Sequence, residues 1–284
     1  MDFLWHLLFT VGSYLPTILS YNLIFGKGKI LHFGPTGVTL MAAYALYLTV
    51  MATGSYLIGL VVSVTAALIL SAFFAWLSFR LEPDGLGIMS IAVHLALLAV
   101  VLNWTELTRG ALGIPRIPRM PFLSSVPSFA VAMTLVAAAW IAALYFLDRS
   151  PFGRQLQALA EHEWHAKALG VDRLRVHTIA FLIAGLSAVS TQAFFPQYIS
   201  LLHPNDYLFP ALIFSVTCVV AGKPGSLFGV TLSTTLLVLL KEGLRFVPLP
   251  LGVLGPLRLL LFGVILLGAV WWRRKELFPM QRTI

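Results

Sequence analysis

Charged residues are scarce in this 284-residue chain: only 11% are Asp, Glu, Lys or Arg, against roughly 25% in an ordinary soluble domain. Hydrophobic residues make up 59% of the chain, and its mean hydropathy is +0.90. The net charge of +8 comes from basic residues spaced between long apolar runs rather than gathered in one patch. This composition excludes a soluble globular protein, a disordered protein and a nucleic-acid-binding protein, and it predicts an all-α polytopic membrane protein.

The residues that carry most enzyme chemistry are also missing. The single cysteine, Cys218, excludes a disulfide within the chain and a thiol metal site. No GxxxxGK[ST] segment is present, so no nucleotide binds through a phosphate loop. His162 and His165 are three residues apart with one acid between them, which is more typical of a solvated helix face than of a metal site. We therefore expect no catalytic residue, no metal and no cofactor.

Ionisable residues within apolar runs are few. His94 lies midway along one run, where we interpret it as a packing residue rather than a proton relay. His6 and Lys241 lie near the ends of runs, where they can extend to the membrane surface. No run carries the paired acids of an ion-coupled carrier. A transporter of this kind, without a nucleotide site, must receive its energy from another subunit.

Nine apolar runs are candidates for membrane-spanning helices, each of which needs about 20 residues. They cover residues 3–25, 30–51, 56–79, 86–102, 126–147, 176–195, 207–220, 227–244 and 254–272. The seventh run is short, because prolines precede it and a Gly-Lys-Pro-Gly turn follows it. Nine spans would use roughly 180 residues and leave little for a separate extramembrane domain, so we expect one domain over residues 1–284.

The distribution of Lys and Arg predicts the orientation. With a cytoplasmic C-terminus, thirteen of the nineteen basic residues lie in inside segments and six lie outside. This bias favours an outside N-terminus and a cytoplasmic C-terminus. An eight-span alternative, with run 207–220 as a re-entrant segment, would move either the Arg273–Lys275 cluster or the loop 148–175 to the outside.

The loop 148–175 is the longest hydrophilic stretch on the predicted cytoplasmic side. Ser150 is a suitable helix N-cap, Pro151 suits the first helical position, and Gly170 suits a C-terminal stop. Apolar residues recur between these positions at helical spacing, which predicts one or two short amphipathic helices. Such a helix either docks onto a partner protein or lies on the membrane surface.

The sequence of this loop, RSPFGRQLQALAEHEWHAKALGV, resembles the coupling segment of permeases in ATP-binding-cassette importers of the branched-chain amino acid family. The matching positions are Arg149, Ser150, Gly153, Arg154, Ala158, Glu161, Glu163, Ala166, Ala168, Leu169, Gly170 and Val171. Segments 22–44, 80–115 and 221–229 are also similar to this family, and the whole chain is closer to the longer of its two permease types. Lys27 and Lys29 depart from the family, which usually has uncharged residues there.

The resemblance implies a transport subunit of the bacterial inner membrane rather than an enzyme, with ATP hydrolysis in a separate subunit. The expected partners are a second permease subunit, two ATP-binding subunits, an extracytoplasmic substrate-binding protein and membrane lipid. Residues of the coupling loop are expected to contact an ATP-binding subunit: Gly153, Arg154, Glu161, Ala166 and Gly170.

Two glycine-rich stretches, residues 26–37 and 222–229, interrupt helices at membrane depth. Interrupted helices can present unpaired amides to a polar solute, although such stretches also occur as tight turns with close helix packing. The candidates for the translocation path are Asn22, Gly34, Pro35, Thr36 and Gly37. A branched-chain amino acid suits this path, and urea or a short amide suits it equally. An autonomous channel or a secondary carrier is the alternative of another class.

We predict that alkaline phosphatase fused after Arg116 is active and that the same enzyme fused after Ile284 is inactive. The physical reason is the excess of basic residues on the side that stays in the cytoplasm. Activity assays on cells expressing each fusion measure the outcome. An inactive fusion at Arg116 together with an active fusion at Ile284 would contradict the nine-span orientation.

Overall fold

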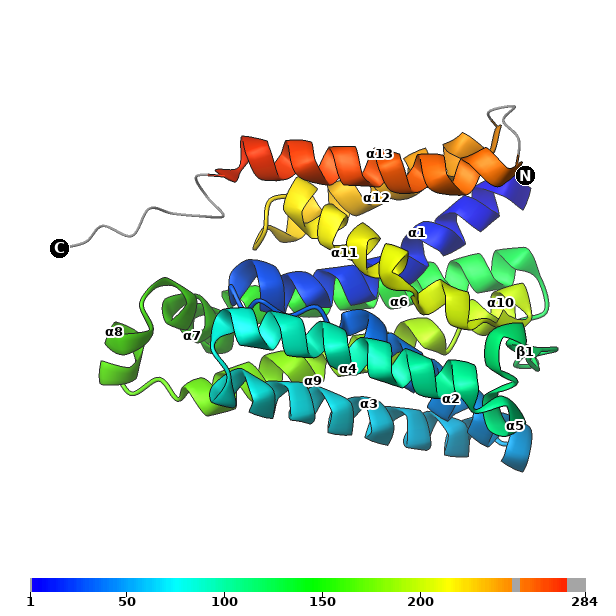
Figure 1. The fold of residues 1–284 in the computed structure, drawn as a ribbon, viewed down its shortest axis with the longest axis horizontal. Coiled ribbons are helices and arrows are strands. Elements are labelled where there is room, and N and C mark those ends of the chain that lie inside the picture. Colours follow the sequence, from blue (N-terminus) through cyan, green and yellow to red (C-terminus); the bar gives the residue numbers. More distant parts are fainter. Residues whose placement is uncertain (1, 247–250, 275–284) are drawn as a thin grey trace.

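The computed structural model describes residues 2–246 and 251–274, and almost all of them are helical (Figure 1). The elements are α1 Asp2–Tyr21, η1 Asn22–Lys27, α2 Pro35–Thr53, α3 Tyr56–Arg80, α4 Pro83–Asn103, α5 Thr105–Thr108, η2 Gly110–Leu112, β1 Ile114–Pro115, α6 Val126–Arg149, α7 Pro151–Glu161, α8 Glu163–Ala168, α9 Arg173–Gln192, α10 Phe195–Ile199, β2 Leu201–Leu202, η3 Pro204–Tyr207, α11 Phe209–Ala221, α12 Leu227–Gly243, η4 Leu244–Phe246 and α13 Leu251–Trp272. The two short strands pair antiparallel, with Ile114 opposite Leu202.

Within the described residues, eight helical segments are long and apolar enough to cross a membrane, and α11 is a shorter apolar helix of 13 residues. These nine segments correspond to the nine apolar runs of the sequence. The prediction of an all-α polytopic membrane protein is therefore confirmed.

The bundle has two distinct ends. We call the end that carries α7 and α8 the loop end, and the opposite end, with residues 104–125 and 200–208, the far end (Figure 1). The N-terminus lies at the far end, whereas α13 finishes near the loop end, as an odd number of crossings requires. Which end faces the cytoplasm stays a prediction, and the basic residues counted at 275–284 lie outside the described residues.

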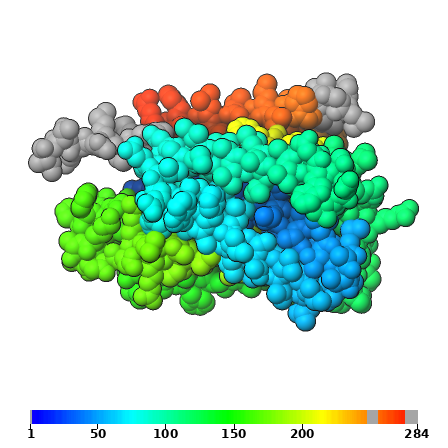
Figure 2. Space-filling model, turned by 60° about the horizontal axis from the view of Figure 1, so that its bottom comes forward, coloured from blue at the N-terminus to red at the C-terminus, as the bar shows by residue number. Residues whose placement is uncertain are grey.

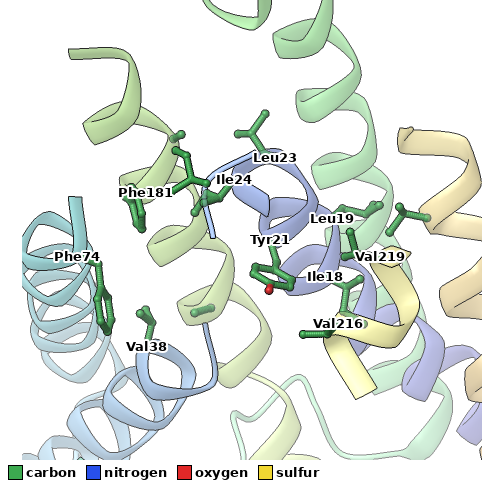
Figure 3. Close-up of a cluster of buried hydrophobic side chains, with 14 of the residues drawn as sticks. Ile18, Leu19, Tyr21, Leu23, Ile24, Val38, Phe74, Phe181, Val216 and Val219 are labelled. Atoms are coloured by element: carbon green, nitrogen blue, oxygen red, sulfur yellow. The ribbon is translucent and has the colours of Figure 1, made fainter. Parts of the chain in front are cut away.

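Helix α1 lies inside the bundle, where it packs against α6, α9 and α12. Figure 3 shows the cluster of buried side chains around its second half, with Tyr21 between Val38 of α2 and Val216 of α11. Small residues allow the closest helix approaches: a Cβ atom added to Gly185 of α9 would lie 2.4 Å from the Ser71 hydroxyl of α3. This use of small residues is typical of membrane helices, which gain little from burying apolar surface against one another.

The second helix begins later than its apolar run. We expected the run to start at residue 30, but α2 begins at Pro35, because proline fits the first helical turn and Gly34 precedes it as the N-cap. Residues 28–34 form no helix. The Gly28 amide donates to the Leu23 carbonyl at 3.0 Å, and the Phe33 amide donates to the Ser90 hydroxyl at 2.8 Å. These bonds replace part of the missing helical ladder.

The two helix interruptions contact each other near the loop end. The Gly225 amide, in the turn before α12, donates to the Asn22 side-chain oxygen at 2.8 Å. Gly225 has φ +84°, which favours glycine. A Cβ atom on Gly26 would lie 2.1 Å from the same Asn22 oxygen, so Gly26 must lack a side chain for this contact to form. The π-helix η1 and the turn 222–226 are therefore held together by Asn22.

We predict that Asn22→Leu lowers the stability of the full-length chain, because it leaves the half-buried Gly225 amide without an acceptor. Such a loss costs about 1–3 kcal/mol, which corresponds to a drop of several degrees in the unfolding midpoint. Cys218 is fully buried, so labelling of its thiol by a fluorogenic maleimide during heating reports unfolding.

The control is Asn103→Leu, at an exposed asparagine whose side chain donates to the Ala99 carbonyl in its own helix. This variant is expected to unfold within about one degree of the wild type, since surface changes are usually small. Equal midpoints for Asn22→Leu and Asn103→Leu would contradict the structural role of Asn22.

Candidate functional site

The loop between α6 and α9 folds as two short helices, α7 and α8, at the loop end of the bundle. The Ser150 hydroxyl accepts from the Gly153 amide at 3.4 Å, Pro151 occupies the first turn, and Gly170 has φ +83° after α8. The sequence predictions of an N-cap at Ser150, a first-turn proline at Pro151 and a helix stop at Gly170 are therefore confirmed. Figure 2 shows this loop, in green, projecting at one end of the molecule while α13 follows another edge.

The five loop residues predicted to contact an ATP-binding subunit divide into two groups. Gly153 and Ala166 are buried within the chain itself. A Cβ atom on Gly153 would lie 2.3 Å from the Asp148 carbonyl, so this glycine permits the turn from α6 into α7. These two residues support the loop from within, and their contact with an ATP-binding subunit stays a prediction. Arg154, Glu161 and Gly170 are exposed, and their contact with a partner stays a prediction.

The most exposed apolar side chains of the loop are Trp164 and Leu169, each 85% accessible. We call this pair the loop tip. The sequence analysis matched Leu169 to the family pattern, but it placed neither residue in the contact with an ATP-binding subunit. Two large apolar residues within a hydrophilic loop are the signal that would have identified this pair.

An ion-pair network holds the loop tip in place. Glu163 pairs with Lys167, and Arg173 donates to Glu163 at 3.0 Å and to the Ser78 carbonyl of α3 at 3.0 Å. Partial burial opposes ionisation of Glu163, but these two cations outweigh it and hold its pKa below the ordinary value. The loop is therefore tied to the end of α3 while its apolar tip stays exposed.

A cavity of about 580 Å³ extends from the middle of the bundle towards the far end. It lies between α1, α2 and α9 on one side and η3, α11, α12 and α13 on the other. Its lining includes Ser13, Tyr14, Thr17, Ile18, Pro35, Thr36, Thr39, Thr191, Gln192, Phe195, Asn205, Asp206, Tyr207, Pro210, Ala211, Phe214, Ser215, Lys241, Gly255, Pro256, Arg258, Leu259 and Phe262. A polar solute could bind here, since hydroxyl groups and three charged side chains interrupt an otherwise apolar wall.

The charged residues of the cavity come from separate segments. Lys241 does not extend to the membrane surface as expected; its Nζ atom donates to the Tyr14 hydroxyl at 2.7 Å and lies 4.9 Å from the centre of that ring. Desolvation raises the pKa of the Asp206 carboxyl above its ordinary value, and the positive charges of His203 and Lys241 act against this rise. Arg258, on α13, is the third charged residue.

Of the five residues predicted for the translocation path, two line this cavity: Pro35 and Thr36. The other three have packing roles. Gly34 lies against Phe74, Gly37 lies against the backbone of His94, and Asn22 holds Gly225. The structure thus brings the start of α2, with Pro35 and Thr36, to the cavity wall.

The cavity ends towards the loop end at a block of buried apolar side chains. Ile18 lines the cavity, and beyond it Tyr21, Ile24 and Val219 continue the same cluster without a gap of comparable size (Figure 3). In the described residues, the space large enough for a solute therefore lies on the far-end side of this block. We call this block of Ile18, Tyr21, Ile24, Val38, Val216 and Val219 the apolar plug.

Comparison with known proteins gives a match along almost the whole chain. The family described as branched-chain amino acid transport system / permease component matches residues 3–270. The high-affinity branched-chain amino acid transport system permease proteins LivM of Salmonella typhimurium and Escherichia coli are each 26% identical over 304 residues, covering 95% of this chain and 68% of theirs. The probable branched-chain amino acid transport permease protein LivM of Methanocaldococcus jannaschii is 24% identical and covers 100% of this chain and 95% of its own.

No solved structure matches the chain. The matched region of the family nevertheless begins in α1 and ends in α13, so it includes both helix interruptions, the loop and every helix that lines the cavity. The family resemblance read from the loop sequence is thereby confirmed. The chain belongs to the family of branched-chain amino acid transport system permease components.

Proposed function

We propose that this chain is the membrane-spanning permease subunit of an ATP-driven importer for branched-chain amino acids in the bacterial inner membrane. The family assignment and the names of the relatives support this function. The observation that carries it is the pairing, in one chain, of a cavity at one end of an apolar bundle with an exposed helical loop at the other. A permease needs both, because solute and energy reach it from opposite sides of the membrane.

In this proposal the far end faces outward and the loop end faces the cytoplasm. An extracytoplasmic substrate-binding protein delivers the amino acid to the cavity, and a second permease subunit completes the pathway. Two ATP-binding subunits hydrolyse ATP and move the loops of the two permeases. The chain itself is not an enzyme.

The contacts of the loop provide a route from the ATP-binding subunit to the cavity. A Cβ atom on Gly28 would lie 3.2 Å from the Leu156 side chain of α7, so segment 28–34 packs directly on the loop. Lys27 donates to the Asp148 carbonyl at 3.0 Å and also pairs with the Asp148 carboxylate. Segment 28–34 leads straight into Pro35 and Thr36, which line the cavity. A displacement of α7 therefore moves the cavity wall through one short stretch of chain.

The secondary-carrier alternative finds little support in the described residues. In ion-coupled carriers, acidic residues at membrane depth commonly bind the coupling ion. Glu242 is the one buried acid on the membrane-spanning helices described, and it accepts from Arg245 at 2.8 Å and lies 3.4 Å from the His6 ring nitrogen. This acid already has partners, so the geometry favours coupling to a separate ATP-binding subunit.

We predict that Leu169→Asp and Trp164→Asp each prevent the ATP-binding subunit from staying bound to the chain. Burying a large apolar side chain is worth about 1.5–3 kcal/mol, so placing a carboxylate there is expected to lower recovery about tenfold or more. Co-purification of the ATP-binding subunit with the tagged chain from membranes gives the recovery, and ATP-driven leucine uptake by the same cells gives the function.

The matched control is Leu112→Asp, a side chain that is 76% accessible but lies at the far end of the bundle. It should leave recovery of the ATP-binding subunit unchanged. Both loop-tip variants have little contact with their own chain, so they should reach the membrane at wild-type levels. Normal recovery and normal uptake for both would place the loop on the membrane surface and remove the support for coupling.

A further inference from the structure

We infer that the cavity contains a binding site for an α-amino acid in its zwitterionic form, with Arg258 binding the carboxylate and Asp206 binding the ammonium group. This inference rests on the proposed function, because it takes the solute of the importer to pass through this cavity. It adds the residues that recognise the solute and the charge state in which the solute binds. Three observations support it: the cavity has three charged side chains, two of them have no direct partner among the described residues, and an apolar wall lies beside them.

Arg258 is the cation that is free to bind an anion. Its Nε atom is buried and has no hydrogen-bond partner in the part of the chain that the structure describes. Buried donors are nearly always paired in folded proteins, and an unpaired one is expected to bind a ligand or water. The planar guanidinium group donates two parallel hydrogen bonds to a carboxylate, which a single ammonium cannot do.

Lys241, the other cation, already has partners within the chain. Its ammonium group donates to Tyr14 and lies 5.8 Å from the centre of the Phe214 ring. The ammonium group of Lys241 therefore adds a fixed positive charge to the same cavity wall. This charge stabilises an anion bound at Arg258 without contacting it directly. The two cations therefore define one anionic subsite, with Arg258 as the residue that contacts the ligand.

Asp206 supplies the opposite charge. It lies in η3 at the far end of the cavity, and its side chain is accessible. Its carboxylate has no hydrogen-bond or ion-pair partner closer than 4 Å among residues 2–246 and 251–274, although the charges of His203 and Lys241 act on it. An ammonium group could bind this carboxylate from within the cavity. Among the described residues that line the cavity, one carboxylate and one guanidinium without direct partners are the complement of a zwitterion.

The rest of the wall suits an aliphatic side chain. The apolar lining includes Ile18, Phe195, Pro210, Phe214, Leu259 and Phe262. Phe214 and Phe262 pack edge to face with ring centres 5.0 Å apart, which gives a continuous aromatic surface between α11 and α13. A ligand with two charges at one end and a branched hydrocarbon at the other matches this division of the cavity.

This distribution separates the amino acid from the uncharged alternatives. Urea or a short amide can hydrogen-bond to the Asp206 carboxylate and the Arg258 guanidinium, but it carries no charge that neutralises either group once water leaves the cavity. A site built around polar groups discriminates strongly against ligands that fail to pair with them. The cavity therefore favours a zwitterion over urea, a choice that the sequence left open.

The test measures binding of radiolabelled leucine to the assembled permease and ATP-binding subunits in nanodiscs. The soluble binding protein is left out, so that only binding to the membrane-embedded site is measured. Leucinamide lacks the carboxylate, and 4-methylpentanoate lacks the ammonium group. Each is expected to compete at least tenfold more weakly than leucine, because each leaves one charged residue unpaired.

Two variants then assign each charge to its residue. Arg258→Gln is expected to weaken leucine binding at least tenfold and to abolish the preference for leucine over leucinamide, while the preference over 4-methylpentanoate remains. Asp206→Asn should show the reverse pattern. The control Arg116→Gln removes an exposed cation at the same end of the bundle that does not line the cavity, and it should change neither preference.

Equal competition by leucine and leucinamide in the wild type would overturn the inference, and this result does not depend on how any variant folds. The inference would also be overturned if Arg258→Gln and Asp206→Asn both kept the preferences for leucine over leucinamide and over 4-methylpentanoate. Leucine uptake by an importer whose membrane part binds no leucine would overturn it too. The proposed function has a separate readout. If the importer with its binding protein takes up no leucine when ATP is supplied, the proposed function fails, even where the charge-specific binding is present.

Discussion

The hydrogen bond from the Gly225 amide to the Asn22 side chain is the contact on which the architecture of the loop end depends. In hydrocarbon a backbone group without a partner costs several kcal/mol, so a helix can be interrupted only where other groups replace its lost bonds. Asn22 does this for the turn before α12, and Ser90 does it for Phe33 in the segment before α2. Because these side chains come from other helices, each interruption also fixes the positions of its neighbours.

The interruptions bring the cavity wall and the loop close together along the chain. Since residues 28–34 form no helix, α2 begins at Pro35 in the middle of the bundle and presents Thr36 to the cavity. The same segment packs on α7 through Gly28, and Lys27 ties it to Asp148 at the end of α6. One irregular stretch thus connects the loop to the cavity wall within a few residues. An uninterrupted helix of the same length would not bring these two parts so close together along the chain.

The sequence predicted the features that depend on local chemistry. Apolar runs located the nine helices, and the Ser150 cap and Gly170 stop located α7 and α8, because neighbouring residues decide these structures. Features that depend on tertiary contacts were missed. The burial of Ala166 depends on how the loop packs on the bundle, and Lys241 turns inward because the hydroxyl of Tyr14, 227 residues away, accepts a hydrogen bond from its ammonium group. Asp206 and Arg258 share a cavity only after α11 and α13 pack together.

The packing of the apolar plug also constrains how a solute could pass. Ile18 belongs both to the cavity wall and to the plug, and α1, α2 and α11 each supply residues to both. A shift of any of these helices that separates Ile18 from Val216 must therefore change the shape of the cavity as well. Close-packed interiors tend to move between discrete arrangements rather than deform gradually. In the proposed importer, a rearrangement that opens the plug therefore also reshapes the cavity, which is the kind of coupling that alternating access requires.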